Sequence, residues 1–265
     1  NKDSNMDDNK LTELSSNFTW TTASYMAELS KYCYDSEVKF KDAIADKSWT
    51  IKYFDFGGTQ AYALNGKDNF ILVFRGTQPN EWQDIKADLD VKKVNSSTVD
   101  GHVEGKVHRG FKYALNDVWK NIKEHMEKCN TNQKQIFITG HSLGAALATL
   151  VAGRLNNPDV VLYTYGSPRV GSKKWNSMQK LTHYRFRNNN DLVTRIPPAF
   201  MGFRHNGKFM YFDTDSEVSV NPTFKKKLVE WFKGMIKGIF TLSFDSFSDH
   251  DISTYHKLCK FQEMK

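Results

Sequence analysis

A glycine-flanked serine in the middle of the chain constrains the fold more than any other feature. The pentapeptide Gly-His-Ser-Leu-Gly occupies residues 140–144, between the apolar run 136–139 and the small-residue stretch 145–148. Glycines two residues before and after a serine permit the sharp, strained turn that presents a nucleophile between a strand and a helix. Backbone N–H groups at the helix N-terminus can then meet developing negative charge. The pattern predicts a nucleophile elbow with Ser142 as its nucleophile.

Strand and helix patterns alternate on both sides of this turn. The predicted strands are 48–56, 60–64, 70–74, 88–94, 135–139, 160–165 and 183–186, and the predicted helices are 19–35, 111–128, 143–155 and 173–179. The run 70–74 is continuously apolar and too short for a buried helix, which indicates a strand covered on both faces. Alternation of this kind is typical of a largely parallel sheet with crossover helices. We therefore expect an α/β fold.

The sequence indicates one folded domain. A chain of 265 residues can bury roughly 70–75% of its unfolded surface, enough for one large α/β core. No internal repeat and no linker divides it, so we expect a flexible segment at 1–16 and a domain at 17–265. The chain begins Asn-Lys-Asp without an initiator Met or a visible signal peptide, so we expect a mature or trimmed chain.

Charge and hydropathy exclude several functions. Lys and Arg number 37 against 30 Asp and Glu, and apart from a cluster at 225–227 the basic residues are spread along the chain. Nucleic-acid binding would require them on one element with interleaved aromatics, so no nucleic-acid partner is expected. The most apolar stretch, 228–244, is interrupted by Glu230, Lys233 and Lys237, so no transmembrane segment is expected.

Motifs for metal and nucleotide chemistry are missing from the sequence. The three cysteines are wrongly spaced for zinc, and no H-E-x-x-H, P-loop or G-x-G-x-x-G occurs. We expect neither a metal nor a cofactor.

A serine nucleophile needs an acid and a base later in the chain, in the order serine, acid, histidine. Asp191 follows the predicted strand 183–187, at the sheet edge expected for Ser142 if the strands are parallel. Asp213 and Asp215 are competitors, but their context indicates a strand end and a turn. Asp191 is the favoured acid.

Two histidines follow far enough along the chain to act as the base. A further helix is predicted at the C-terminal end of the chain, and His250 begins it, coming off a loop from which a side chain can reach across the sheet edge. His256 lies within that helix, where a structural role is more common. His250 is therefore favoured, and His141 is interpreted as a packed residue behind the elbow.

These motifs together resemble class 3 lipases, the fungal-type α/β-hydrolases. The matching stretches, in the order and approximate spacing of that family, are 73–77, 107–111, 140–148, 165–171, 190–193, 196–198 and 249–250. The resemblance covers nearly the whole chain from Tyr25. It implies a single-domain α/β-hydrolase with a largely parallel central sheet, crossover helices and a short lid helix. It also implies a secreted protein.

The resemblance assigns further residues. It implies an oxyanion hole at Thr77 and Leu143, where backbone N–H groups and the Thr77 hydroxyl would bind the tetrahedral oxyanion. The lid candidate follows Thr77, with Trp82 and Ile85 as its main apolar residues. Because this segment is otherwise polar, esterase or phospholipase specificity stays open.

The cysteines match the family in one respect. Relatives can carry a disulfide between the N-terminal and C-terminal helices, and Cys33 and Cys259 stand at those positions. The resemblance thus implies a Cys33–Cys259 bond, with Cys129 free.

A basic amphipathic segment at 224–240 precedes His250. Its apolar residues recur at helical spacing, and lysines occupy much of the remainder. A helix that packs on the sheet is the favoured interpretation. The alternative is a helix that contacts a lipid surface peripherally.

The expected function is a serine carboxylester hydrolase of acyl lipids at a lipid–water interface, foremost a triacylglycerol lipase. Alternatives within the same chemistry are a phospholipase A1 and a feruloyl-type esterase. Outside enzymes, the alternatives are a non-catalytic lipase-like binding module and a membrane-active protein whose effector is 224–240.

Overall fold

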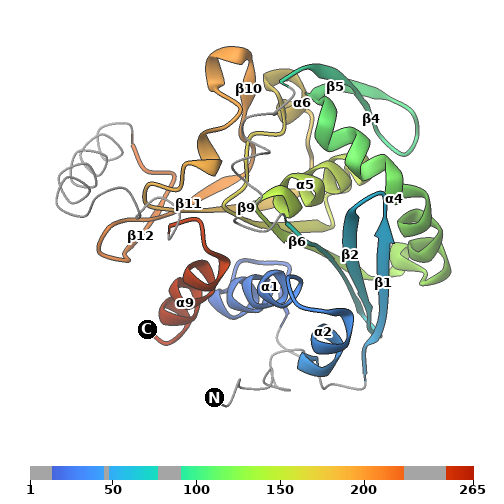
Figure 1. Ribbon diagram of the computed structural model, residues 1–265, viewed down its shortest axis with the longest axis horizontal. Helices are drawn as coiled ribbons and strands as arrows, with labels where there is room; N and C mark the ends of the chain where they lie inside the picture. Colours follow the sequence, from blue (N-terminus) through green and yellow to red (C-terminus); the bar gives the residue numbers. More distant parts are fainter. Residues whose placement is uncertain (1–13, 45–47, 77–90, 224–248) are drawn as a thin grey trace.

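A twisted sheet of eight strands runs through the middle of the molecule in the computed structural model (Figure 1). The structure describes residues 14–44, 48–76, 91–223 and 249–265. Thr77, the lid candidate with Trp82 and Ile85, the segment 224–240 and residues 1–13 lie outside the described residues.

The strand order is β1-β2-β3-β6-β7-β9-β11-β12. The strands are β1 (Thr50–Phe56), β2 (Thr59–Asn65), β3 (Asn69–Phe74), β6 (Gln135–His141), β7 (Val160–Tyr165), β9 (Thr182–Asn188), β11 (Lys208–Phe212) and β12 (Val218–Val220). The five strands from β3 to β11 are parallel, and antiparallel strands flank them on both sides. The expected α/β fold with a largely parallel central sheet is confirmed.

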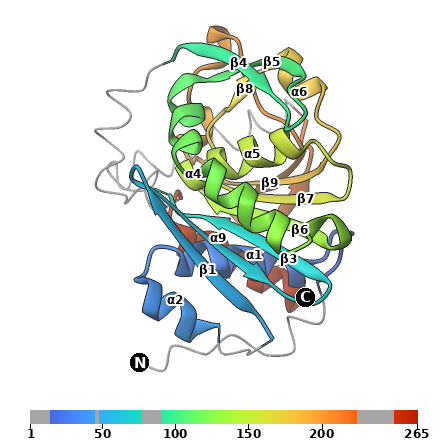
Figure 2. The same ribbon diagram turned by 90° about the vertical axis from the view of Figure 1, so that its right-hand side faces the viewer.

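Helices cover both faces of this sheet (Figures 1 and 2). One face is covered by α1 (Trp20–Tyr32), α2 (Glu37–Ala43) and α9 (Ile252–Glu263), and the other by α4 (Arg109–Lys128) and α5 (Leu143–Leu155). The side chains of strand β3 point alternately to the two faces of the sheet, so each face needs a layer of helices to cover it. Ile71 and Val73 pack in the α1 and α9 core, whereas Phe70, Leu72 and Phe74 pack in the α4 and α5 core. The continuous apolar run is thus buried on both faces, as predicted.

A second, four-stranded sheet lies beyond α4 and α5 at the top of Figure 2. Its strands, in spatial order, are β10 (Phe203–Arg204), β8 (Gly171–Ser172), β5 (Val103–His108) and β4 (Lys93–Ser97), and α6 (Lys173–Ser177) follows β8. The strand predicted at 88–94 corresponds to β4, which begins at Lys93. A short alternating segment locates a strand in sequence more reliably than it defines where pairing starts.

The expected Cys33–Cys259 disulfide is wrong for this structure, because all three cysteines are free. The Cys33 thiol faces the Val73 carbonyl of β3, at 4.0 Å. Cys259 lies in α9, and both cysteines belong to the same core. Both thiols are buried as small apolar groups.

In the part of the chain that the structure describes, none of the helices combines the length and the apolar character that crossing a membrane requires.

Candidate active site

Ser142 lies on a strained turn between β6 and α5. Its backbone adopts φ 58° and ψ −127°, which is unfavourable for a residue with a side chain. The flanking glycines permit the turn, because a Cβ atom on Gly140 would lie 2.4 Å from the Gly144 carbonyl oxygen. One on Gly144 would lie 2.2 Å from the Phe74 oxygen. The predicted elbow geometry is present, and only glycine fits at these two positions.

This strain gives a stability prediction for Ser142→Gly. Both Ser142→Ala and Ser142→Gly remove the hydroxyl, but only glycine relieves the positive φ. We expect Ser142→Gly to be more stable than Ser142→Ala by about 1 kcal/mol, which raises Tm by about 2–4 °C. Differential scanning calorimetry of the two variants measures this difference. Equal Tm values would show that the turn stores no strain.

The structure brings together the three residues favoured as nucleophile, base and acid. His250 Nε2 lies 2.8 Å from Ser142 Oγ, and His250 Nδ1 lies 2.9 and 3.0 Å from the two carboxylate oxygens of Asp191. All three residues are buried. Ser142 follows β6, Asp191 follows β9, and His250 precedes α9. The three residues are distant in the sequence and meet at one edge of the sheet. The hydrogen-bond order Ser142–His250–Asp191 is that of a catalytic triad.

The competing residues lie elsewhere. Asp213 accepts hydrogen bonds from the backbone N–H groups of Asp215 and Glu217, in a turn after β11. His256 lies inside α9. Neither aspartate is hydrogen-bonded to His250 or His256 in the described part of the chain.

Asp191 is held by two further donors. Tyr255 Oη donates to Asp191 Oδ2 at 2.6 Å, and the Val193 N–H donates to Oδ1 at 2.9 Å. Burial acts to raise the pKa of Asp191, but the charge of His250 and the hydrogen bonds from His250 and Tyr255 lower it below its ordinary value. The carboxylate therefore stays ionised. Tyr255 was not predicted, since one tyrosine in an amphipathic helix gives no signal that distinguishes it from a core residue.

His141 connects the elbow to the backbone of His250. Its Nε2 donates to the His250 carbonyl oxygen at 2.6 Å, because a carbonyl only accepts. Burial, above all, lowers the pKa of His141 to about 3, so the ring is neutral and Nδ1 accepts from the Tyr34 hydroxyl at 2.8 Å. His141 is thus buried behind the elbow and also determines where the His250 backbone lies.

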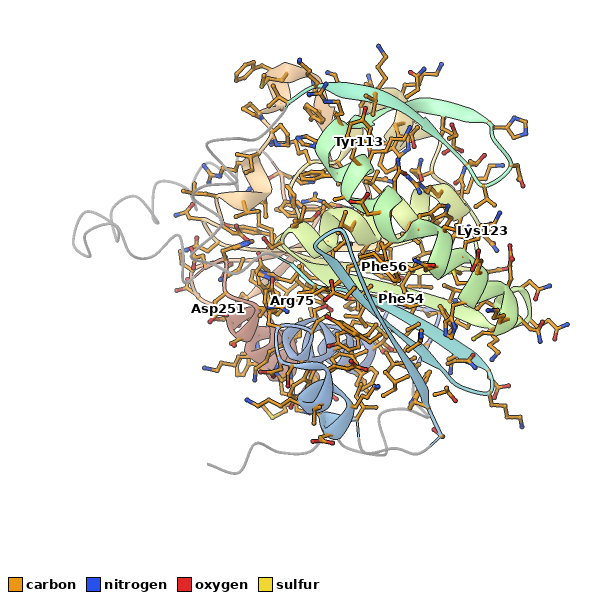
Figure 3. The ribbon with its side chains drawn as sticks, turned by 45° about the vertical axis from the view of Figure 1, so that its right-hand side comes forward. Phe54, Phe56, Arg75, Tyr113, Lys123 and Asp251 are labelled. Atoms are coloured by element: carbon orange, nitrogen blue, oxygen red, sulfur yellow. The ribbon has the colours of Figure 1, made fainter. Side chains whose placement is uncertain are left out.

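Tyr34 lies next to both His141 of the elbow and Gly76, which follows β3. Its hydroxyl and the His141 carbonyl oxygen both crowd Gly76, so a Cβ atom there would lie 2.2 Å from the Tyr34 Oη. Arg75 and Asp251, whose charges act on Tyr34, lie on the same side of the molecule, where β3 ends and α9 begins (Figure 3). No sequence motif marks Tyr34, and only the fold reveals its contact with the elbow.

The two oxyanion-hole candidates differ in what the structure describes. Leu143 is the first residue of α5, so its backbone N–H has no acceptor within the helix. The elbow places that N–H directly after Ser142. Thr77 lies outside the described residues, and its role stays a prediction.

Two buried histidines, His141 and His183, and the partly buried His205 give a pH prediction. Burial lowers the pKa of His141 and His183 to about 3 and that of His205 well below its ordinary value. As the pH falls below about 6.5, the unfolded chain binds protons that the folded chain cannot, so acid favours unfolding. We expect the free energy of unfolding to fall by up to about 4 kcal/mol per pH unit below pH 6.

Urea unfolding between about pH 7.5 and pH 5 measures this slope. The control is His102→Gln, which changes an exposed histidine and should leave the slope as in the wild type. A free energy of unfolding that is constant over this range would contradict the prediction.

The fold and the geometry at the elbow define the class of protein: an α/β-hydrolase with a Ser–His–Asp arrangement. The sequence model of the family described as Lipase (class 3) matches residues 71–201, which include Ser142 and Asp191. The chain belongs to the class 3 lipase family, as the motifs indicated.

Individual relatives agree with this family. The chain is 38% identical over 114 residues to secreted mono- and diacylglycerol lipase 1 of Fusarium solani, covering 40% of this chain and 34% of that one. It is 31% identical over 183 residues to a lipase of Rhizomucor miehei, covering 64% and 48%. The matches thus span about a third to a half of the length of these curated relatives.

A solved structure gives the same fold. It is a triacylglycerol lipase described as having a serine protease triad at its catalytic centre. The TM-score is 0.61 at 26% identity, and the match covers 75% of this chain and 82% of that one.

Proposed function

We propose that this protein is a serine carboxylester hydrolase of acyl lipids, with triacylglycerols as its main substrates. The observation that carries the proposal is the hydrogen-bonded chain from Ser142 through His250 to Asp191, at distances of 2.8 and 2.9 Å. A binding module has no physical use for a serine on a strained turn joined to a histidine and a buried carboxylate.

In the proposed mechanism, Ser142 Oγ attacks the ester carbonyl carbon while His250 Nε2 takes its proton. Asp191 accepts from His250 Nδ1 and stabilises the imidazolium that forms. The Leu143 N–H, with Thr77 as the second donor, stabilises the tetrahedral oxyanion. His250 then donates its proton to the leaving alcohol. Water, deprotonated by His250, hydrolyses the acyl-enzyme and restores Ser142.

The substrate class rests on the relatives. Their names specify mono- and diacylglycerols in one case and triacylglycerols in another. We extend this chemistry to the present chain. We propose that the protein acts at a lipid–water interface and that it is secreted. For 224–240, packing on the sheet stays the favoured interpretation and peripheral lipid contact the alternative. Phospholipase A1 and feruloyl-type esterase activities are the alternatives that the experiment separates.

Hydrolysis assays combined with covalent labelling test the proposal. Hydrolysis by the wild-type protein is measured on an emulsified long-chain triacylglycerol, a phosphatidylcholine dispersion and a feruloyl ester. The protein is then treated with an alkyl phosphonate, which labels a reactive serine. We expect fastest release of acid from triacylglycerol and one phosphonate per chain on the peptide that contains Ser142. Urea-unfolded protein is the control and should not be labelled.

A higher rate on phosphatidylcholine or on the feruloyl ester, with Ser142 labelled, would replace the substrate class but keep the mechanism. No hydrolysis and no labelling would overturn the mechanism itself.

A further inference from the structure

Five arginines gather near β9 with few acidic neighbours. They come from the loop after β7, from β9, and from the segments before and within β10: Arg169, Arg185, Arg187, Arg195 and Arg204. Burial lowers the pKa of Arg169, Arg185 and Arg195, and the positive charges of neighbouring arginines lower it further. The described carboxylates form no ion pair with any of them. The group therefore carries a concentrated positive charge.

Several of these arginines donate to backbone carbonyls. Arg169 bonds the carbonyl oxygens of Arg195 and Pro197, and Arg204 bonds that of Ala199. Such bonds satisfy N–H groups, but a neutral carbonyl does not balance a full positive charge. The hydrogen bonds thus hold the loops in place, but they do not neutralise the positive charge of the group.

Arg185 is the most buried of the five. The residue is only 8% exposed, and its guanidinium carbon lies 4.3 Å from the centre of the Phe209 ring. Its Nε donates to the Asn206 carbonyl oxygen at 3.2 Å, and no described residue accepts from its two terminal amino groups. Burial, with the charges of Arg187 and Arg169, lowers the pKa of Arg185 to about 9, so it remains charged at neutral pH. A buried charge without a counter-charge is strongly unfavourable.

A small recess adjoins this guanidinium. Arg185, Arg204, His205, Asn206 and Ser167 are among its lining residues, and none of the described residues that line it is acidic. The recess has a volume of about 10 Å³, which is room for about one water molecule or one monatomic ion. A phosphate or a carboxylate headgroup is too large. Because Arg204 is exposed, an ion could exchange with solvent past its side chain.

We propose that this recess binds a small monovalent inorganic anion of the halide class, chloride in biological fluids, against Arg185 and Arg204. The anion accepts hydrogen bonds from the terminal amino groups of Arg185 and supplies the missing negative charge. It joins β9 to the loop at Ser167 and to the segment 204–206. A water molecule fits the same space but carries no charge. The inference concerns stability and does not depend on the proposed hydrolysis.

Thermal unfolding in different sodium salts at fixed ionic strength tests the proposal. We expect chloride and bromide to raise the Tm of the wild-type protein by about 2–4 °C in a saturable way relative to gluconate, which is too large for the recess. Arg185→Gln should abolish this difference. The control Lys67→Gln removes an exposed positive charge in the turn between β2 and β3 and should retain it.

A second measurement decides the question if Arg185→Gln does not fold. Crystals of the wild-type protein grown with bromide should show an anomalous peak between Arg185 and Arg204. Equal Tm values in chloride and gluconate would overturn the proposal. A bromide peak in the recess without any effect on Tm would indicate an adventitious ion only, and it would overturn the proposal as well.

Discussion

Ser142→Ala should lower kcat for every ester substrate by about 10⁶-fold, the largest effect that we expect from any single substitution. The change removes the only atom of the residue that can attack the ester carbonyl, while the hydrogen bond between His250 and Asp191 is retained. Alanine keeps the Cβ atom and hence the same strained backbone at φ 58°, so Tm should change little. Initial rates on a soluble ester, with Tm measured on the same preparation, separate lost chemistry from lost folding.

The matched control for this substitution is Ser177→Ala. Ser177 is exposed at the end of α6, and its hydroxyl donates to the Lys174 carbonyl oxygen. It should retain wild-type kcat. If Ser142→Ala kept more than about one per cent of wild-type activity, the nucleophile would have to be a different residue.

Asp191→Asn should lower kcat by about 10⁴-fold, with little change in KM. The carboxylate accepts from His250 Nδ1, from the Tyr255 hydroxyl and from the Val193 N–H. An asparagine has one acceptor oxygen for these three donors, and its amide group donates instead. His250 would then accept at Nδ1 and carry its proton on Nε2, so it would present an N–H group to Ser142 rather than a lone pair.

Steady-state kinetics from about pH 6 to pH 10 measure this effect, because part of the lost rate should return when hydroxide can deprotonate Ser142 directly. Asp159→Asn makes the same chemical change at an exposed position after α5 and serves as the control. A loss of only a few-fold in Asp191→Asn would show that Asp191 supports His250 by position alone.

Much of the fold could be predicted because its signals are local. The apolar run of β3 and the Gly-His-Ser-Leu-Gly turn each determine their structure within a few residues. Chain order and strand ends then led from Ser142 to Asp191. His250 was distinguished from His256 by its place on a loop, and the structure puts His250 within hydrogen-bond distance of both partners.

Contacts between distant segments could not be predicted in this way. Tyr34 meets His141 across 107 positions, and Tyr255 meets Asp191 across 64, with no local pattern at either tyrosine. The disulfide expectation failed for a related reason. The resemblance located Cys33 and Cys259 near one another on two helices that pack together, but whether two thiols meet depends on how those helices pack.

The packing of α1 against α9 has a consequence for synthesis of the chain. The two helices lie side by side under the sheet (Figure 1), and buried residues of both, such as Leu29 and Tyr255, belong to one core. The ribosome makes α1 before the first strand and α9 after the last. The apolar face of α1 therefore lacks its helical partner until more than two hundred residues have been added. Contacts between such distant segments slow folding, and the nascent helix is a natural binding site for chaperones.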